Sequence, residues 1–238
     1  MMRGTLAMLA MGLFGVGTAP LRADPVVVEL FTSQGCSSCP PADAYLAELA
    51  KRDDVIALSL HVDYWDYIGW KDSFASPHFT ARQKAYARVA QERSVYTPQM
   101  VVNGRERVVG NHPRDVGLLI RQHGAQPDVI DLNLTRAGDT VMIKAKPLQR
   151  IAGPVMVQLV QFAPMEKVRI KRGENAGRVI EYANVVTDWQ RVGEWDGKAP
   201  LALPVTVTAR GGGSVAVILQ AVAGKTGPAE VLAAAQLR

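Results

Sequence analysis

Two cysteines with two residues between them, followed at once by two prolines, restrict the fold of this chain more than any other feature. Residues 35–41 have the sequence Gly-Cys-Ser-Ser-Cys-Pro-Pro. The apolar, β-branched run at residues 26–31 predicts a strand that is covered on both faces. Because a helix tolerates proline only in its first turn, the two prolines predict a helix that begins near Ser37. The sequence therefore places two thiols between a buried strand and the start of a helix.

This placement predicts redox chemistry at the two thiols. The amide groups and the dipole of a helix stabilise a thiolate in the first turn. We expect Cys36 to be the outer cysteine, with its sulfur towards solvent, and to act as the attacking thiolate. Cys39 lies further into the helix and would resolve the mixed disulfide.

Other uses of the cysteine pair have less support. A zinc site needs four ligands, and the four histidines are too far apart along the chain to supply the usual second pair. A purely structural disulfide across so short a loop would stabilise the fold by only about 2 kcal/mol. Two functionless free thiols would oxidise in an exported protein. We therefore predict no cofactor and no resident metal, with a metal chaperone that binds through both thiolates as an alternative.

The first 23 residues have the features of a cleaved signal peptide. Arg3 gives a positive start, residues 6–16 are apolar, and Ala23 is a suitable small residue for cleavage. The apolar run is too short to cross a bilayer, which needs about 20 residues, so no stable membrane span is predicted. We expect a periplasmic or secreted protein, in a compartment where disulfides form and persist.

Composition excludes several classes of protein. The chain has 238 residues and a net charge of +5, with no run of like charges that would form a nucleic-acid arm. A nucleic-acid partner is therefore not expected. Two cysteines are too few for a disulfide-stapled scaffold or for a site made of four thiolates.

Strand-like and helix-like segments alternate as far as Gly124. The pattern predicts the order β-α-β-α-β-β-α, with helices starting near Ser37, at Ser76-Pro77 and at Pro113. The dipeptide Asn103-Gly104 suits a tight hairpin turn between the last two strands.

The chain after Gly124 has only β-like segments separated by turn residues. They lie at residues 129–135, 141–146, 155–162, 179–192, 202–208, 215–222 and 230–237. Their number and spacing predict an antiparallel sandwich or partial barrel. We therefore divide the chain into a signal peptide (1–23), an α/β domain (24–124) and an all-β domain (125–238). The short connection between the two domains predicts that they pack as one rigid body.

A proline stands at the first position of a predicted strand. Thr97-Pro98 precedes residues 99–102, and such a proline is where a cis peptide bond can be held. The alternative is an ordinary trans loop proline. We expect the cis form, with Thr97 and Pro98 beside Cys36 as parts of the site.

The order of elements, the two cysteines and the proline together resemble the thioredoxin fold. Cys36, Cys39 and Pro98 occupy its motif positions, and the resemblance covers about residues 25–124. More narrowly, two stretches resemble a bacterial exported family catalogued as domain of unknown function 1223. They are Phe-Thr-Ser-Gln-Gly-Cys-Ser-Ser-Cys-Pro-Pro-Ala-Asp at residues 31–43 and His-Val-Asp-Tyr-Trp-Asp at residues 61–66. The resemblance implies the fold, whereas the name of the family carries no activity.

The chain departs from thioredoxins around the cysteines. Gly35 stands where many oxidoreductases of this fold have an aromatic residue, so substrate packing must differ. The dipeptide Ser37-Ser38 between the cysteines differs from the dipeptide at this place in reducing thioredoxins and from that in a strongly oxidising enzyme of this fold. The direction of electron flow therefore stays open. Glu29 in the central strand is either a buried acid that takes the proton of Cys39 or a residue at the strand rim that reaches water.

Two further segments are candidates for contact with a substrate. Aromatic and acidic residues interleave after the second strand, where Asp63, Trp65 and Trp70 could line the edge of the sheet beside the cysteines. The alternative is that these aromatics fill the joint with the β half. The polar loop at residues 171–178 is either a solvated hairpin connection or a flap, in which Glu174 or Asn175 approaches the rim near Asp63 and Trp65.

These features together predict an exported thiol–disulfide oxidoreductase. Its substrates would be thiols or disulfides of proteins or small molecules, and a separate redox partner would be needed. The alternative is a non-catalytic module that binds a partner or a small ligand and keeps its disulfide closed.

Overall fold

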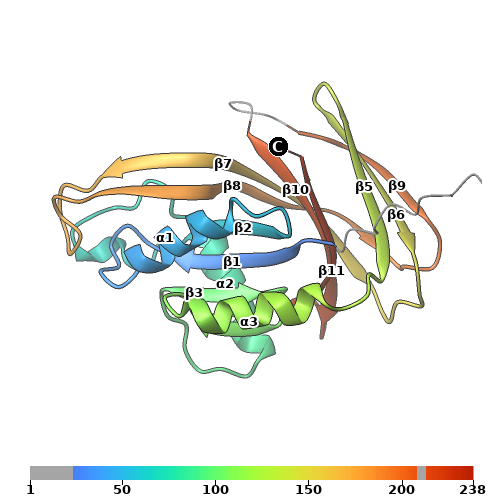
Figure 1. The fold of residues 1–238 in the computed structure, drawn as a ribbon, viewed down its shortest axis with the longest axis horizontal. Helices are drawn as coiled ribbons and strands as arrows, with labels where there is room; N and C mark the ends of the chain where they lie inside the picture. Colours follow the sequence, from blue (N-terminus) through green and yellow to red (C-terminus); the bar gives the residue numbers. More distant parts are fainter. Residues whose placement is uncertain (1–23, 208–212, 238) are drawn as a thin grey trace, which may run out of the picture.

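The computed structural model describes residues 24–207 and 213–237, so the predicted signal peptide lies outside the described residues. Within that part of the chain, no helix is long and apolar enough to cross a bilayer. The predicted order of elements in the first half is confirmed (Figure 1). They are β1 (Val26–Thr32), α1 (Pro40–Leu49), β2 (Val55–His61), the short 3-10 helix η1 (Asp66–Ile68), α2 (Pro77–Val89), β3 (Gln99–Val102), β4 (Glu106–Val109) and α3 (Pro113–Gly124).

The second half consists of strands, as predicted. The alanine-rich last segment is a strand that pairs antiparallel with the one before it. The strands are β5 (Ile130–Ala137), β6 (Thr140–Pro147), β7 (Val155–Arg169), β8 (Val179–Trp195), β9 (Leu201–Thr206), β10 (Ser214–Ala223) and β11 (Gly227–Leu237).

One sheet runs through both halves of the molecule. Its eight strands have the order β11-β10-β7-β8-β2-β1-β3-β4 (Figure 1). Strand β8 joins β2 where Val185 pairs with Ser59. Next to this pair, the side-chain amide of Asn184 donates to the carbonyl of Ala57 at 2.8 Å. The junction places the long β7–β8 hairpin directly beside the α/β part of the fold.

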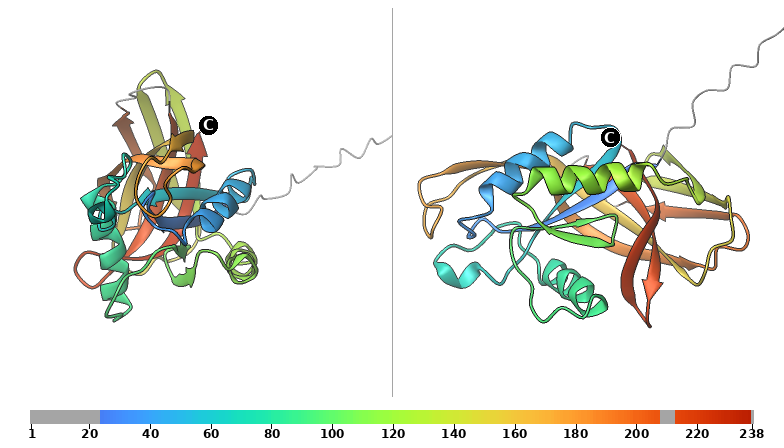
Figure 2. Two further views of the ribbon diagram at one scale, coloured as in Figure 1. Left: turned by 90° about the vertical axis from the view of Figure 1, so that its left-hand side faces the viewer. Right: turned by 60° about the horizontal axis from the view of Figure 1, so that its bottom comes forward.

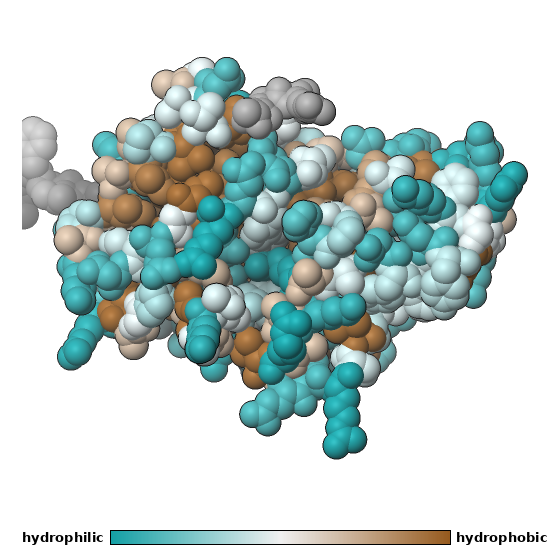
Figure 3. Space-filling view, turned by 180° about the vertical axis from the view of Figure 1, so that it is seen from behind, coloured by the Kyte–Doolittle hydropathy of each residue, from teal (hydrophilic) through white to brown (hydrophobic). Residues whose placement is uncertain are grey.

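The other three strands form a second sheet, in the order β5-β6-β9. Val141 and Ile143 of this sheet share a core with Val157 and Val217 of the large sheet, which gives a sandwich-like end to the molecule (Figure 2). The same core includes half-buried leucines and valines, and Figure 3 shows apolar side chains reaching the surface at this end.

The helices cover opposite faces of β1. Because successive residues of a strand point to opposite sides, Val28 and Leu30 pack with α1 and α3, whereas Phe31 packs with Tyr86 of α2. The core under α2 also includes residues of β7, β8, β10 and β11. Helix α2 therefore packs with one face against both halves of the chain.

The predicted hairpin turn also connects the halves. Asn103 and Gly104 have φ values of 48° and 74°, as the tight turn requires. The carbonyl of Asn103 accepts from the amide of Val231 at 2.9 Å, and its side-chain amide donates to the Val231 carbonyl at 3.1 Å. The last strand is thereby fixed to the first half.

A buried ion pair lies at the centre of the core under α2. Arg82 of α2 donates to both carboxylate oxygens of Glu29, at 2.6 and 2.7 Å. Tyr86 donates to the same carboxylate at 2.6 Å. The guanidinium also bonds to Gln220 of β10 at 3.2 Å and lies 3.8 Å from the ring centroid of Trp189. This group links β1, α2 and the strands of the second half through satisfied polar contacts.

Removal of one partner of this ion pair should strongly destabilise the fold. Arg82→Met leaves the Glu29 carboxylate buried and uncompensated, so we expect a loss of about 3–5 kcal/mol in the free energy of unfolding. Urea unfolding followed by tryptophan fluorescence measures the change. Lys167→Met is the control, because its pair with Glu181 is exposed and should contribute less than about 1 kcal/mol. A loss for Arg82→Met no larger than that of the control would contradict the assignment.

Candidate functional site

The two cysteines form a disulfide in the loop between β1 and α1. The bond joins Cys36 and Cys39, with a Cα–Cα distance of 5.4 Å. The prediction that the helix begins near Ser37 is wrong, since α1 begins at Pro40 and Cys39 is its N-cap residue. The reason is that the cysteines close a turn of their own, in which the amide of Cys39 donates to the carbonyl of Cys36 at 3.3 Å. Cys36 therefore precedes the helix instead of lying in it.

The predicted exposure of Cys36 is also wrong. Cys36 is 1% exposed and Cys39 is fully buried, although Ser37 and Ser38 between them are exposed. The tip of the β7–β8 hairpin lies against this loop. The side-chain amide of Asn175 donates to the carbonyl of Cys36 at 2.9 Å and to that of Gln34 at 3.0 Å.

Asn175 and Glu174 differ in their placement. Asn175 is 1% exposed and bound to the cysteine loop, whereas Glu174 points to solvent on the same tip. Of the two residues predicted in this loop, the structure brings Asn175 alone to the disulfide.

Trp65 links the cysteine loop to the predicted cis proline. The Thr97-Pro98 peptide bond is cis, as predicted. The indole N–H of Trp65 donates to the hydroxyl of Thr97 at 2.8 Å. A Cβ atom added at Gly35 would lie 3.4 Å from Cβ of Trp65 and 3.1 Å from Ile68. Trp65, Thr97 and the residue before Cys36 therefore form one packed group.

Gly110 lets the Pro98 loop lie against α1. A Cβ atom added there would meet Cβ of Ala42 at 3.1 Å and Cβ of Pro98 at 3.3 Å. The lack of a side chain at Gly110 thus allows the cis proline to lie close to the first turn of the helix.

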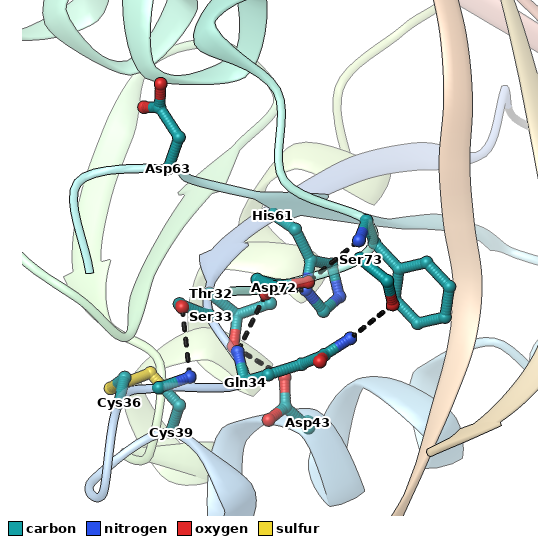
Figure 4. A network of polar contacts seen from close by, with 12 residues as sticks. Thr32, Ser33, Gln34, Cys36, Cys39, Asp43, His61, Asp63, Asp72 and Ser73 are labelled. Atoms are coloured by element: carbon teal, nitrogen blue, oxygen red, sulfur yellow. Dashed lines mark hydrogen bonds and ion pairs between the residues drawn. A yellow bond between two sulfur atoms is a disulfide. The ribbon is translucent and has the colours of Figure 1, made fainter. Parts of the chain in front are cut away.

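Asp63 and Trp70, the other two predicted contact residues, have different surroundings. The carboxylate of Asp63 accepts from Thr80 of α2 at 2.6 Å and points away from the disulfide (Figure 4). Trp70 donates to the side chain of Gln34 at 2.7 Å and packs in the cluster around Tyr182 of β8. The structure thus places Trp70 in the joint with the β half.

Glu29 is buried, and its carboxylate lies on the α2 side of β1, bound to Arg82 and Tyr86. The disulfide is at the start of α1, which covers the opposite face. The structure does not bring Glu29 and the cysteines together.

A second buried acid, missed by sequence analysis, lies in the helix that Cys39 caps. Asp43 is 2% exposed, and its amide donates to the carbonyl of Cys39 at 3.1 Å. Its carboxylate accepts from the hydroxyl of Thr32 at 2.8 Å. Burial raises the pKa of Asp43 to about 7, against the opposing effect of His61. The sequence does hold a sign that Asp43 is buried. This acid lies on the same face of α1 as Ala42, Leu46 and Leu49, which pack in the core.

His61 and Asp72 complete this polar cluster at the ends of β1 and β2 (Figure 4). Because the two strands are parallel, Thr32 and His61 lie side by side at the same edge. The ring Nδ1 of His61 lies 2.7 Å from the carboxylate of Asp72, which also accepts from the amide of Gln34 at 2.8 Å. The cluster is thus bonded directly to the loop that carries Cys36.

Several atoms of the cluster are not hydrogen-bonded. Asp43 Oδ2, His61 Nε2 and the Tyr182 hydroxyl are buried without a partner among the described residues. The three side chains are close enough to interact, since the rings of His61 and Tyr182 are 4.8 Å apart and the charge of Asp43 helps to raise the pKa of Tyr182. The cluster thus has buried groups beside the cysteine loop that can make further hydrogen bonds.

Comparisons with known proteins identify relatives without a stated activity. The model of a family described as "Protein of unknown function (DUF1223)" matches residues 27–220. The crystal structure of protein AGR_C_4864 from Agrobacterium tumefaciens is 36% identical, with a TM-score of 0.78 over 90% of this chain and 94% of that chain. HBP35 of Porphyromonas gingivalis is similar in fold alone, at 16% identity and a TM-score of 0.58, over 90% of this chain and 75% of that chain. No curated protein matches the chain.

The protonation of Asp43 should make the stability of the protein depend on pH. Its pKa of about 7 in the folded protein exceeds the usual value of 3.8, so the folded state binds the extra proton between these pH values. The free energy of unfolding should therefore fall as pH rises from about 4 to about 7. Asp43→Asn should flatten this fall, as measured by urea unfolding at several pH values.

The matched control is Asp139→Asn, at an exposed turn position. It should leave the pH profile of stability unchanged. A profile of Asp43→Asn that superimposes on that of the wild type would show that the carboxyl is ionised throughout and would refute the assignment.

Proposed function

We propose an activity for this protein, which belongs to the DUF1223 family of proteins of unknown function: it is an exported thiol–disulfide oxidoreductase that acts through Cys36 and Cys39. The observation that carries the proposal is the surroundings of the disulfide at the N-terminus of α1. The loop of this disulfide is hydrogen-bonded, through the amide of Gln34, to a buried polar cluster in which Asp43 has a pKa of about 7. A disulfide with a stabilising role alone needs no such proton donor.

The reaction transfers two electrons between a dithiol and the disulfide. A substrate thiolate attacks Sγ of Cys36, the bond to Cys39 breaks, and the electron pair leaves on the sulfur of Cys39, which takes up a proton. A second substrate thiolate then attacks the substrate sulfur of the mixed disulfide and releases Cys36. The substrate becomes a disulfide, and the protein is left as a dithiol that a disulfide-bearing partner reoxidises. The same steps in reverse reduce a substrate disulfide when a dithiol partner supplies the electrons.

Asp43 is the residue that we assign to the proton of Cys39. It lies one helical turn beyond Cys39 and is protonated over much of the range below neutral pH. A neutral carboxyl can give its proton to the leaving thiolate and recover it when the thiol attacks again. His61 and Asp72 are positioning residues in this scheme, because they fix the end of β2 and the cysteine loop.

A second candidate function rests on the burial of Cys36. At 1% exposure the disulfide is closed to large reactants in this conformation. A binding module that keeps the disulfide permanently closed would have this property, and its ligand affinity would survive replacement of both cysteines.

Replacement of each cysteine separates the two functions. Turnover of a model dithiol, coupled to a glutathione buffer, should fall at least 100-fold in Cys36→Ser. Cys39→Ser should instead accumulate a mixed disulfide on Cys36, detectable by mass spectrometry. Ser37→Ala is the control within the same loop and should keep most of the activity. Equal turnover in Cys36→Ser and the wild type would exclude the redox mechanism.

A further inference from the structure

The tip of the β7–β8 hairpin has a defined conformation of its own. Around it, the amide of Ile170 donates to the carbonyl of Arg178 at 3.0 Å, and the amide of Gly177 donates to that of Ile170 at 2.9 Å. Gly173 and Gly177 have positive φ values of 77° and 84°, which close the turn. The tip, residues 170–178, is therefore a folded turn and not a loose loop.

This tip contacts the site at two points. Asn175 donates to the carbonyls of Gln34 and Cys36, as described above. Gly173 lies against Trp70, where an added Cβ would be 3.3 Å from Cβ of the tryptophan. The rest of the tip is mostly exposed, so these few contacts hold it against the loop that carries Cys36.

The contacts of Asn175 use the main-chain acceptors next to the disulfide. An extended polypeptide that approached Cys36 from this side would compete with Asn175 for these carbonyls through its own amide groups. The side-chain amide of Asn175 occupies them from within the chain. A polypeptide thiol must therefore displace the whole tip, whereas a small thiol needs only a local opening around Asn175.

We propose that residues 170–178 form a selectivity lid, latched by Asn175, that admits low-molecular-weight thiols and disulfides to Cys36 and excludes those of polypeptides. The inference rests on the proposed function for its substrate class. The latch itself is a property of the fold and can be tested separately.

The first experiment measures access to the disulfide without reference to any activity. The full chain is treated with a water-soluble phosphine, and reduction of the Cys36–Cys39 bond is followed by alkylation and mass spectrometry. Asn175→Ala should be reduced at least 10-fold faster than the wild type. Asn175→Asp keeps the shape but places a carboxylate against two carbonyls, so it should open the lid as well. Glu174→Ala, on the exposed side of the same tip, should change the rate less than twofold.

The second experiment measures selectivity. Each variant is assayed with a small dithiol and with a peptide that contains two cysteines. The wild type should favour the small dithiol, and Asn175→Ala should raise the turnover of the peptide at least 10-fold more than that of the small dithiol. Thermal unfolding of each variant checks that the fold is retained.

The outcomes separate the lid from the proposed function. Equal reduction rates for the wild type, Asn175→Ala and Asn175→Asp would overturn the lid. Equal turnover of peptide and small dithiol by the wild type would overturn the substrate class. No turnover of either substrate by any variant would overturn the proposed function, while a 10-fold change in the phosphine rate would still support the latch.

Discussion

The pairing of β8 with β2 is the constraint on which the rest of this structure depends. Within the large sheet, one main-chain pair, Ser59 with Val185, and one side-chain bond, Asn184 to Ala57, join β8 to β2. This register brings Tyr182 against His61 and the hairpin tip over the cysteine loop. A shift by one residue would turn these side chains to the other face of the sheet. The β half is thus part of the candidate site and not an appended module.

Two buried polar groups, on opposite sides of β1, have different physical characters. In the first, the Glu29 carboxylate accepts from Arg82 and Tyr86 and is fully compensated. Such a pair fixes the packing of α2. In the second, Asp43 has one bonded oxygen and one without a partner among the described residues, and its pKa lies near 7. A group of this kind can change its charge at neutral pH, which is the property that disulfide exchange needs from a neighbour of Cys39.

Local sequence signals predicted the local structure well. Ser76 caps α2 by accepting from the amide of His78, Asn103-Gly104 forms the hairpin turn, and α3 spans Pro113–Gly124, because each depends on residues adjacent in sequence. The contact of Asn175 with the Cys36 carbonyl could not be predicted in this way, since it joins residues 139 positions apart. The roles of Glu29 and Asp43 likewise depend on which helix covers which face of β1, and periodicity alone does not settle that choice.

The reduction potential of the Cys36–Cys39 bond tests the central claim most directly. It is obtained by equilibrating the full chain with thiol–disulfide buffers of known potential and measuring the fraction of reduced protein. A redox-active pair should have a potential between about −270 and −120 mV, within the range of known dithiol enzymes. A value below about −300 mV, typical of structural disulfides in secreted proteins, would contradict the account.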